Sequence, residues 1–158
     1  MTESYILYLD TLLPAEAVLE TMFMPKHIAP VEGTTMLYAR GSVYLAHAQP
    51  LPEAMQERYQ VQLNFTPTLS IRYFPDGVSS FKTALHLLAE CVMRWIHQSG
   101  DTLLLTTSKN ALVLRWQHNK IQINSHHAFW GQERLKYLDL PYDDEEGIQD
   151  DDACDRSQ

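Results

Sequence analysis

The stretch SSFKTALHLLAECVMRWIHQSG, residues 79–100, decides the fold of this chain. Its apolar residues recur every three or four positions and form one stripe along a helix: Phe81, Ala84, Leu85, Leu88, Cys91, Val92, Trp95 and Ile96. The opposite side is polar: Lys82, His86, Glu90 and Arg94. We predict an amphipathic helix from Ser79 to Ser99, with Gly100 as its C-cap. A helix of this length is about 30 Å long, enough to cross a sheet.

Strands are predicted on both sides of this helix. Before it the pattern indicates a strand at Tyr5–Leu9, a helix from Pro14 to about Phe23, and four strands at Thr35–Arg40, Val43–His47, Tyr59–Phe65 and Leu69–Tyr73. After it come strands at Leu103–Thr106, Ala111–Trp116 and Ile121–Asn124. The predicted fold class is α+β: a mainly antiparallel meander sheet of about six to eight strands with two helices packed on it, in the order β-α-ββββ-α-βββ.

Three of these strands rest on specific signals. Gly41 and Ser42 separate two apolar runs by the two residues typical of a tight hairpin. In the segment 59–65, apolar residues at every second position alternate with Gln60, Gln62 and Asn64, which predicts a half-buried strand with one amide face.

Length and charge divide the chain into two parts. Its 158 residues are 45% hydrophobic and fit one α+β domain, which we place at residues 1–142. Residues 1–138 hold eleven acids and eleven bases, whereas residues 139–158 hold nine acids and one base and account for the net charge of −8. We expect the acidic tail, residues 143–158, to be disordered alone. No positive stretch is visible, so we expect neither nucleic acid nor a membrane as partner.

The amino-terminal sequence favours a cytoplasmic protein. MTESYILYLDTLLPAEA has no basic start and carries Glu3 and Asp10, which a secretory signal would avoid. No segment approaches the roughly 20 apolar residues that span a bilayer.

No motif for catalysis or for metal binding is visible. Cys91 lies in the apolar stripe and Cys154 in the acidic tail, without the spacing of a zinc or redox site, so Cys91 is interpreted as a small core residue. His126 and His127 are adjacent and would face opposite ways on a strand, so we interpret them as loop and packing residues. We expect no enzyme, no cofactor and no bound metal.

Several short strings resemble the swarming-inhibition immunity proteins of bacteria. These are YILYL at 5–9, LPAE at 13–16, FTPTLSI at 65–71, SGDTLLL at 99–105, and Phe129-Trp130 before Leu135 and Pro141-Tyr142. The resemblance implies a cytosolic antidote that binds and neutralises a toxin delivered by neighbouring cells. It supplies no catalytic residue, and the acidic tail has no counterpart in it. The alternative is a cytosolic chaperone or adaptor for a secreted effector.

Candidate partner contacts follow from charge and from aromatic content. The acids are Asp143, Asp144, Glu145, Glu146, Asp150, Asp151 and Asp152, and the aromatic anchors are Trp116, Trp130 and Tyr73, with Phe74 beside them. If the toxin is a basic nuclease domain, the tail imitates the phosphate backbone. The simpler alternative is that the tail only keeps the protein soluble. We expect a monomer or a weak dimer.

Overall fold

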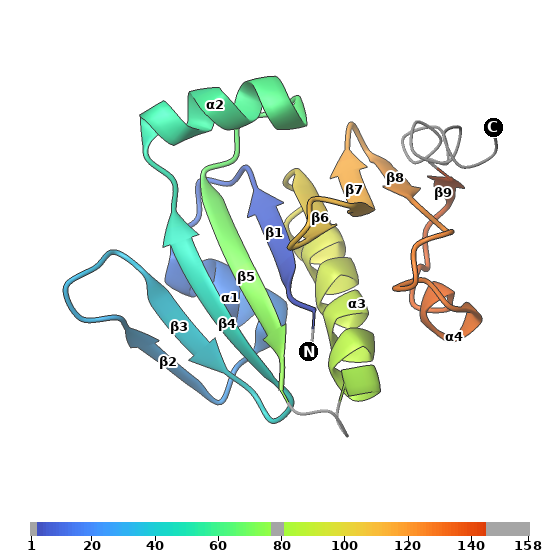
Figure 1. Ribbon diagram of the computed structural model, residues 1–158, viewed down its shortest axis with the longest axis horizontal. Coiled ribbons are helices and arrows are strands. Elements are labelled where there is room, and N and C mark those ends of the chain that lie inside the picture. The colour runs from blue at the N-terminus through green and yellow to red at the C-terminus, as the bar shows by residue number, and fades with distance from the viewer. Residues whose placement is uncertain (1–2, 77–80, 145–158) are drawn as a thin grey trace.

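The computed structural model describes residues 3–76 and 81–144. Over these ranges the chain forms one sheet in the order β2-β3-β4-β5-β1-β6-β7-β8-β9 (Figure 1). Its strands are β1 (Tyr5–Leu9), β2 (His27–Pro30), β3 (Leu37–Arg40), β4 (Tyr44–Pro50), β5 (Leu69–Pro75), β6 (Leu103–Thr107), β7 (Leu112–Gln117), β8 (Lys120–Ile123) and β9 (Tyr142–Asp144). Neighbours are antiparallel except β8 and β9, which are parallel. The predicted α+β class is confirmed.

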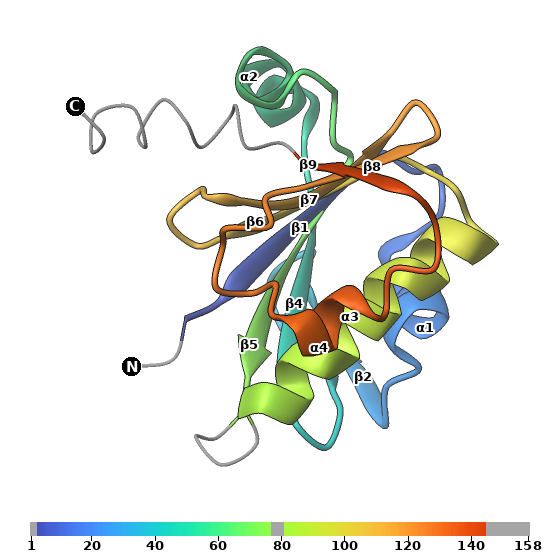
Figure 2. The same ribbon diagram turned by 90° about the vertical axis from the view of Figure 1, so that its right-hand side faces the viewer.

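Four helices accompany the sheet in the described ranges: α1 (Ala15–Phe23), α2 (Glu53–Leu63), α3 (Phe81–Gln98) and α4 (Gln132–Leu135). Figure 2 shows α1 and α3 on the same side of the sheet and α2 at its far end. We call the side covered by α1 and α3 the inner face and the opposite side the outer face. None of the described helices is both long and apolar enough to cross a bilayer.

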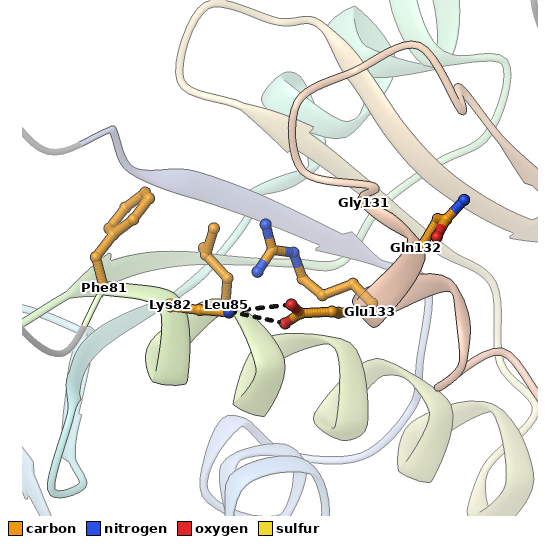
Figure 3. A pocket seen from close by; sticks show the side chains of 7 residues that line it. Phe81, Lys82, Leu85, Gly131, Gln132 and Glu133 are labelled. Carbon is orange, nitrogen blue, oxygen red and sulfur yellow. Dashed lines mark hydrogen bonds and ion pairs between the residues drawn. The ribbon is translucent and has the colours of Figure 1, made fainter.

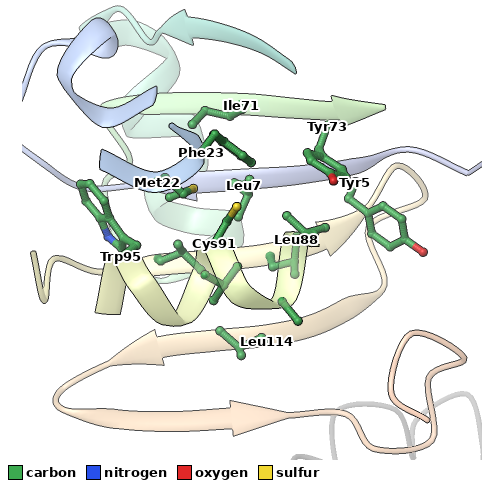
Figure 4. Close-up of a cluster of buried hydrophobic side chains, with 14 of the residues drawn as sticks. Tyr5, Leu7, Met22, Phe23, Ile71, Tyr73, Leu88, Cys91, Trp95 and Leu114 are labelled. Atoms are coloured by element: carbon green, nitrogen blue, oxygen red, sulfur yellow. The ribbon is translucent and has the colours of Figure 1, made fainter. Parts of the chain in front are cut away.

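The main core lies between the inner face and these two helices. Except for the half-buried Phe81, the stripe predicted on α3 is buried, with Cys91 and Trp95 fully inaccessible, and Figure 4 shows both side chains beside Met22 of α1. The indole of Trp95 also donates a hydrogen bond to the backbone oxygen of Asp101, at 3.1 Å. The interpretation of Cys91 as a core residue is confirmed.

The first strand occupies the centre of the sheet rather than one edge of a meander. All five residues of β1 are buried, and Leu7 lies opposite Ile71 of β5 and Leu105 of β6. Burial of apolar side chains stabilises the fold, so a strand that is apolar on both faces is most stable where both faces of the sheet are covered. This explains the central place of β1.

The strand predicted over residues 59–65 was wrong. This segment belongs to α2 and the loop after it, and Val61, placed on the apolar face of that strand, is 87% exposed. Pro52 precedes the first helical residue and Asn64 ends the helix in the left-handed conformation, at φ 63°. The short strand β2 was not predicted, and the observed order is therefore β-α-βββ-α-β-α-βββ-α-β.

The sheet extends two residues past the predicted domain boundary. Asp143 and Asp144 lie in β9 opposite Gln122 and Ile123 of β8. The carboxylate of Asp144 accepts hydrogen bonds from the amide and the hydroxyl of Ser125. The remaining tail acids, from Glu145 onward, lie outside the described residues.

Candidate binding face

The outer face of the sheet has only a small cover. A second apolar cluster on this face consists of Ile6, Tyr8, Phe65, Leu104 and Leu112, against which Tyr59 and Leu63 of α2 pack. No residue of α2 is itself buried. Apart from one end of β4 and β5, which α2 overhangs, the part of the outer face formed by β2, β3, β4 and β5 has no described helix over it (Figure 2).

Aromatic and basic side chains cross this open part from strand to strand. The cross-strand register places His27 opposite Arg40, Tyr38 opposite His47, His47 opposite Arg72, and Leu45 opposite Phe74. Directly opposite residues point to the same face, so these side chains share the outer face. We call His27, Tyr38, Arg40, His47, Arg72 and Phe74 the aromatic–basic stripe.

The rings of the stripe form a continuous series of contacts. The centroid of Tyr38 lies 6.1 Å from that of His27 and 6.2 Å from that of His47, which in turn lies 5.4 Å from Phe74. The Arg40 guanidinium lies over the Tyr38 ring, 5.9 Å from its centroid. Arg40 and Arg72 are exposed, whereas Tyr38 and Phe74 are half-buried.

No acid balances these bases within the strands. The sequences of β2, β3, β4 and β5 are HIAP, LYAR, YLAHAQP and LSIRYFP, without Asp or Glu. Among the described residues, ion pairs join Lys82 and His86 to Glu133 and His97 to Asp139, all away from the stripe. The body of the chain is neutral in total, yet its fold gathers a locally basic surface.

A hollow of about 170 Å³ lies at one end of the stripe, where α2 overhangs β4, β5 and β1. Its lining is Ile6, Tyr8, Met36, His47, Gln49, Leu51, Met55, Tyr59, Ser70 and Arg72. The rings of Tyr8 and Tyr59 are 5.1 Å apart. Burial raises the pKa of Tyr8 to about 12, and Tyr59 adds to this while Arg72 opposes it. Tyr8 therefore keeps its hydroxyl proton at neutral pH.

The aromatic residues predicted as partner anchors lie in the core instead of on an exposed surface. Tyr73 is fully buried, and its hydroxyl donates to the backbone oxygen of Ala84 at 2.6 Å. Trp116 and Trp130 are 8% and 6% exposed, and their indoles donate to the backbone oxygens of Gly100 and Val113. Each indole or hydroxyl proton thus ties the ring to the backbone.

The predicted acids are only partly placed by the structure. Asp143 and Asp144 are exposed on the edge strand β9, and Asp143 lines a shallow hollow together with Trp116. Glu145, Glu146, Asp150, Asp151 and Asp152 lie outside the described residues. Phe74, by contrast, belongs to the stripe.

Another hollow, of about 480 Å³, separates the start of α3 from α4 (Figure 3). It is crossed by an ion pair between Lys82 Nζ and Glu133 Oε2 at 2.9 Å, and the Lys82 ammonium lowers the pKa of Glu133. Both side chains are more than half exposed, so the pair contributes little to stability.

A further hollow lies between the β1–α1 connection and the end of α3. Its rim carries Asp10 and Asp101 beside Leu12 and Leu13, both exposed. Burial and the charge of Asp101 raise the pKa of Asp10, and the Thr11 hydroxyl donates to Asp101 at 2.8 Å. It is a second exposed apolar area, without the converging donors of the outer face.

The structure places the three residues considered for catalysis or metal binding in the core and in a turn. Burial raises the pKa of Cys91 to about 12, so its thiol stays protonated and is a poor nucleophile. His126 and His127 lie in the turn after β8, where His127 Nδ1 accepts a hydrogen bond from the Phe129 amide. In the part of the chain that the structure describes, no three acids, histidines or cysteines are grouped to hold a metal ion.

No protein-family model, no curated protein sequence and no solved structure matches this chain. The stripe was not predicted from the sequence, although a signal for it was present. The predicted two-residue turn at Gly41 and Ser42 would pair Tyr38 with Leu45, whereas the observed register is shifted by two residues and pairs Tyr38 with His47, so the predicted tight hairpin was wrong in its register. The acid-free composition of these strands is visible in the residues themselves.

Proposed function

We propose that this protein acts by binding another protein, and that the contact surface is the outer face of β2, β3, β4 and β5. The observation that supports this is the aromatic–basic stripe on a sheet face that α2 overhangs at one end and that no other described helix covers. Aromatic residues and arginine are the types most enriched in binding hot spots. A half-buried ring beside an exposed guanidinium offers a partner both apolar area and directional hydrogen bonds.

The specific form that we propose is an immunity protein that binds and neutralises a cognate toxin from neighbouring cells. This form of the proposal is supported by the resemblance of residues 5–9, 65–71 and 99–105 to the swarming-inhibition immunity proteins, together with the open face. An immunity protein needs a preformed surface more than a reactive group. A stripe built on four paired strands is held rigidly by the sheet, which lowers the entropic cost of binding.

The test combines co-expression with a charge-reversal variant. Any toxin-domain protein that proves to be encoded beside this chain is expressed with wild type, with Arg40→Glu/Arg72→Glu, or with the control Lys109→Glu/Lys136→Glu. All four substituted side chains are exposed, and the two variants change the net charge equally. Growth of the co-expressing cells and co-purification of the toxin-domain protein with this chain are then both measured.

We expect wild type and the Lys109→Glu/Lys136→Glu control to bind the toxin and restore growth, and the stripe variant to lose both. Retained binding and growth with the stripe variant would contradict the proposed surface. Failure of wild type to protect, combined with capture of a secreted effector by a dimeric bait, would replace the immunity proposal by the chaperone.

A further inference from the structure

The floor of the hollow under α2 is a small grid of side chains on three strands. Register places His47, Arg72 and Ile6 in one row across β4, β5 and β1, and Gln49, Ser70 and Tyr8 in the next row. Met55 and Tyr59 of α2 form the wall over this grid. Polar donors therefore lie beside an apolar and aromatic wall within one enclosure.

The donors of the floor are unused. Among the described residues, the side chains of His47, Gln49, Ser70 and Arg72 make no hydrogen bond with another protein group, and no carboxylate lines the hollow. A guanidinium presents up to five N–H donors in a planar fork, which matches the two oxygens of a carboxylate. The group that best complements these donors is an anionic hydrogen-bond acceptor.

The position of α2 is fixed by its carboxyl end. Arg115 of β7 donates to the backbone oxygen of Leu63 at 3.0 Å, and Gln117 donates to that of Asn64 at 3.3 Å. Near the other end, the Gln56 amide donates to the backbone oxygen of Leu51 at 2.8 Å. The wall is therefore held in place before any ligand arrives, as a preformed pocket requires.

The volume of the hollow under α2 limits the size of the group that it can hold. About 170 Å³ is smaller than the roughly 300–1,000 Å³ of pockets that hold whole cofactors or drug-sized ligands. It suits one side chain whose main chain stays outside on the stripe.

The geometry points to a subsite for one acidic side chain of the partner, presented by a segment that lies along the stripe. The carboxylate accepts hydrogen bonds from Arg72 and from the neighbouring polar floor, while its methylene groups contact Met55 and Tyr59. This inference rests on the proposed function, since it specifies what the bound protein inserts.

A protein segment fits this surface better than a nucleic acid. Strong binding of nucleic acid neutralises many phosphates, whereas the stripe holds two arginines and the chain carries a net charge of −8. A single carboxylate that is partly removed from water needs only a local donor set, which the floor supplies.

The experiment uses two blocked dipeptides, N-acetyl-Phe-Glu-amide and N-acetyl-Phe-Gln-amide, which differ in one carboxylate. Each is titrated into the full chain while backbone amide resonances are followed by NMR. We expect the Glu probe to shift the amides of His47, Ser70 and Arg72 and to bind about tenfold more tightly than the Gln probe.

Two variants test whether Arg72 causes the difference in affinity between the two probes. Arg72→Gln should remove the difference between the probes, whereas Lys109→Gln, at an exposed residue outside both the stripe and the lining of the hollow, should keep it. Equal binding of both probes by wild type, or shifts confined to other strands, would overturn the subsite. Tighter, Arg72-dependent binding of a ten-residue oligothymidylate would overturn it in favour of nucleic acid.

The subsite and the proposed function fail separately. If Arg72→Gln binds the toxin as wild type does and the probes do not discriminate, the subsite is wrong while protein binding stands. If the probes discriminate as expected but wild type binds no toxin, the subsite stands and the immunity function fails.

Discussion

At the scale of single residues, Trp95 shows how one side chain links α3 to the core. It is fully buried among apolar neighbours, and its indole satisfies the backbone oxygen of Asp101. We expect Trp95→Asp to unfold the protein, because it combines the loss of a large ring, about 3–5 kcal/mol, with a buried charge. Circular dichroism would show the loss of secondary structure in this variant. Trp95→Phe, which keeps an apolar ring, should remain folded. A folded Trp95→Asp variant would contradict this packing.

Tyr8 makes the stability of the folded protein fall with rising pH in the alkaline range. Burial raises its pKa to about 12 in the folded protein, whereas an unperturbed tyrosine has a pKa of 10.0. The folded state thus holds this proton more tightly, so its contribution to stability is complete below about pH 10 and is lost as pH rises towards 12. We expect the urea midpoint of wild type to fall more steeply in this window than that of Tyr8→Phe. Parallel falls would show that Tyr8 is not the cause.

Gly41 is required by the ring that lies against it. A Cβ at this position would lie 2.1 Å from Cε1 of Tyr44, whose side chain is buried and has little room to move. We expect Gly41→Ala to cost about 1–3 kcal/mol in the free energy of unfolding, as overpacking does. Gly131→Ala is the matched control, since a Cβ there meets nothing within 4 Å. Equal unfolding free energies for the two variants would contradict this reading.

At the scale of elements, α2 is held at its ends by hydrogen bonds of Arg115, Gln117 and Gln56 but packs on the outer face with few side chains. None of its residues is buried, and its packing relies on Tyr59 and Leu63. We expect Tyr59→Ala to speed amide hydrogen exchange throughout α2 while leaving α3 unchanged, because the sheet core does not depend on this contact. Val61→Ala should change neither helix, since Val61 is 87% exposed. Accelerated exchange in α3 as well would show that α2 unfolds only with the whole domain.

The same helix shows where prediction from sequence fails. Residues 59–65 alternate as a strand does, yet Met55, Tyr59 and Leu63 also repeat at helical spacing, and both periods fit so short a segment. The flanking Pro52 and Asn64 favour the helix. By contrast, α3 and β1 were predicted correctly because their apolar patterns are long or uninterrupted.

The candidate site was harder to predict than the core. Trp116 and Trp130 are aromatic and near strand ends, and sequence alone does not tell an exposed ring from one bonded to a backbone oxygen. The stripe depends on register across four strands, and Arg72 meets His47 only because β5 pairs with β4 from beyond α2. Charge counted along the chain does not reveal such a surface.

At the scale of the whole molecule, the unequal cover of the two sheet faces is the central feature. The inner face is buried under α1 and α3, while the outer face keeps half-buried aromatic rings and exposed arginines over β2 to β5. Tyr142 to Asp144 extend the sheet at the opposite edge, far along the strand order from the stripe. The described acids Asp143 and Asp144 therefore lie at the sheet edge remote from the basic surface.

The most direct test of the outer face as the contact surface is hydroxyl-radical footprinting of the protein alone and bound to its partner. Met36, Tyr38 and Phe74 report on the stripe and the hollow, whereas Met24, 66% exposed after α1, reports on the other side. We predict that binding protects Met36, Tyr38 and Phe74 from oxidation and leaves Met24 unchanged. Protection of Met24 with unchanged labelling of Tyr38 and Phe74 would contradict the account.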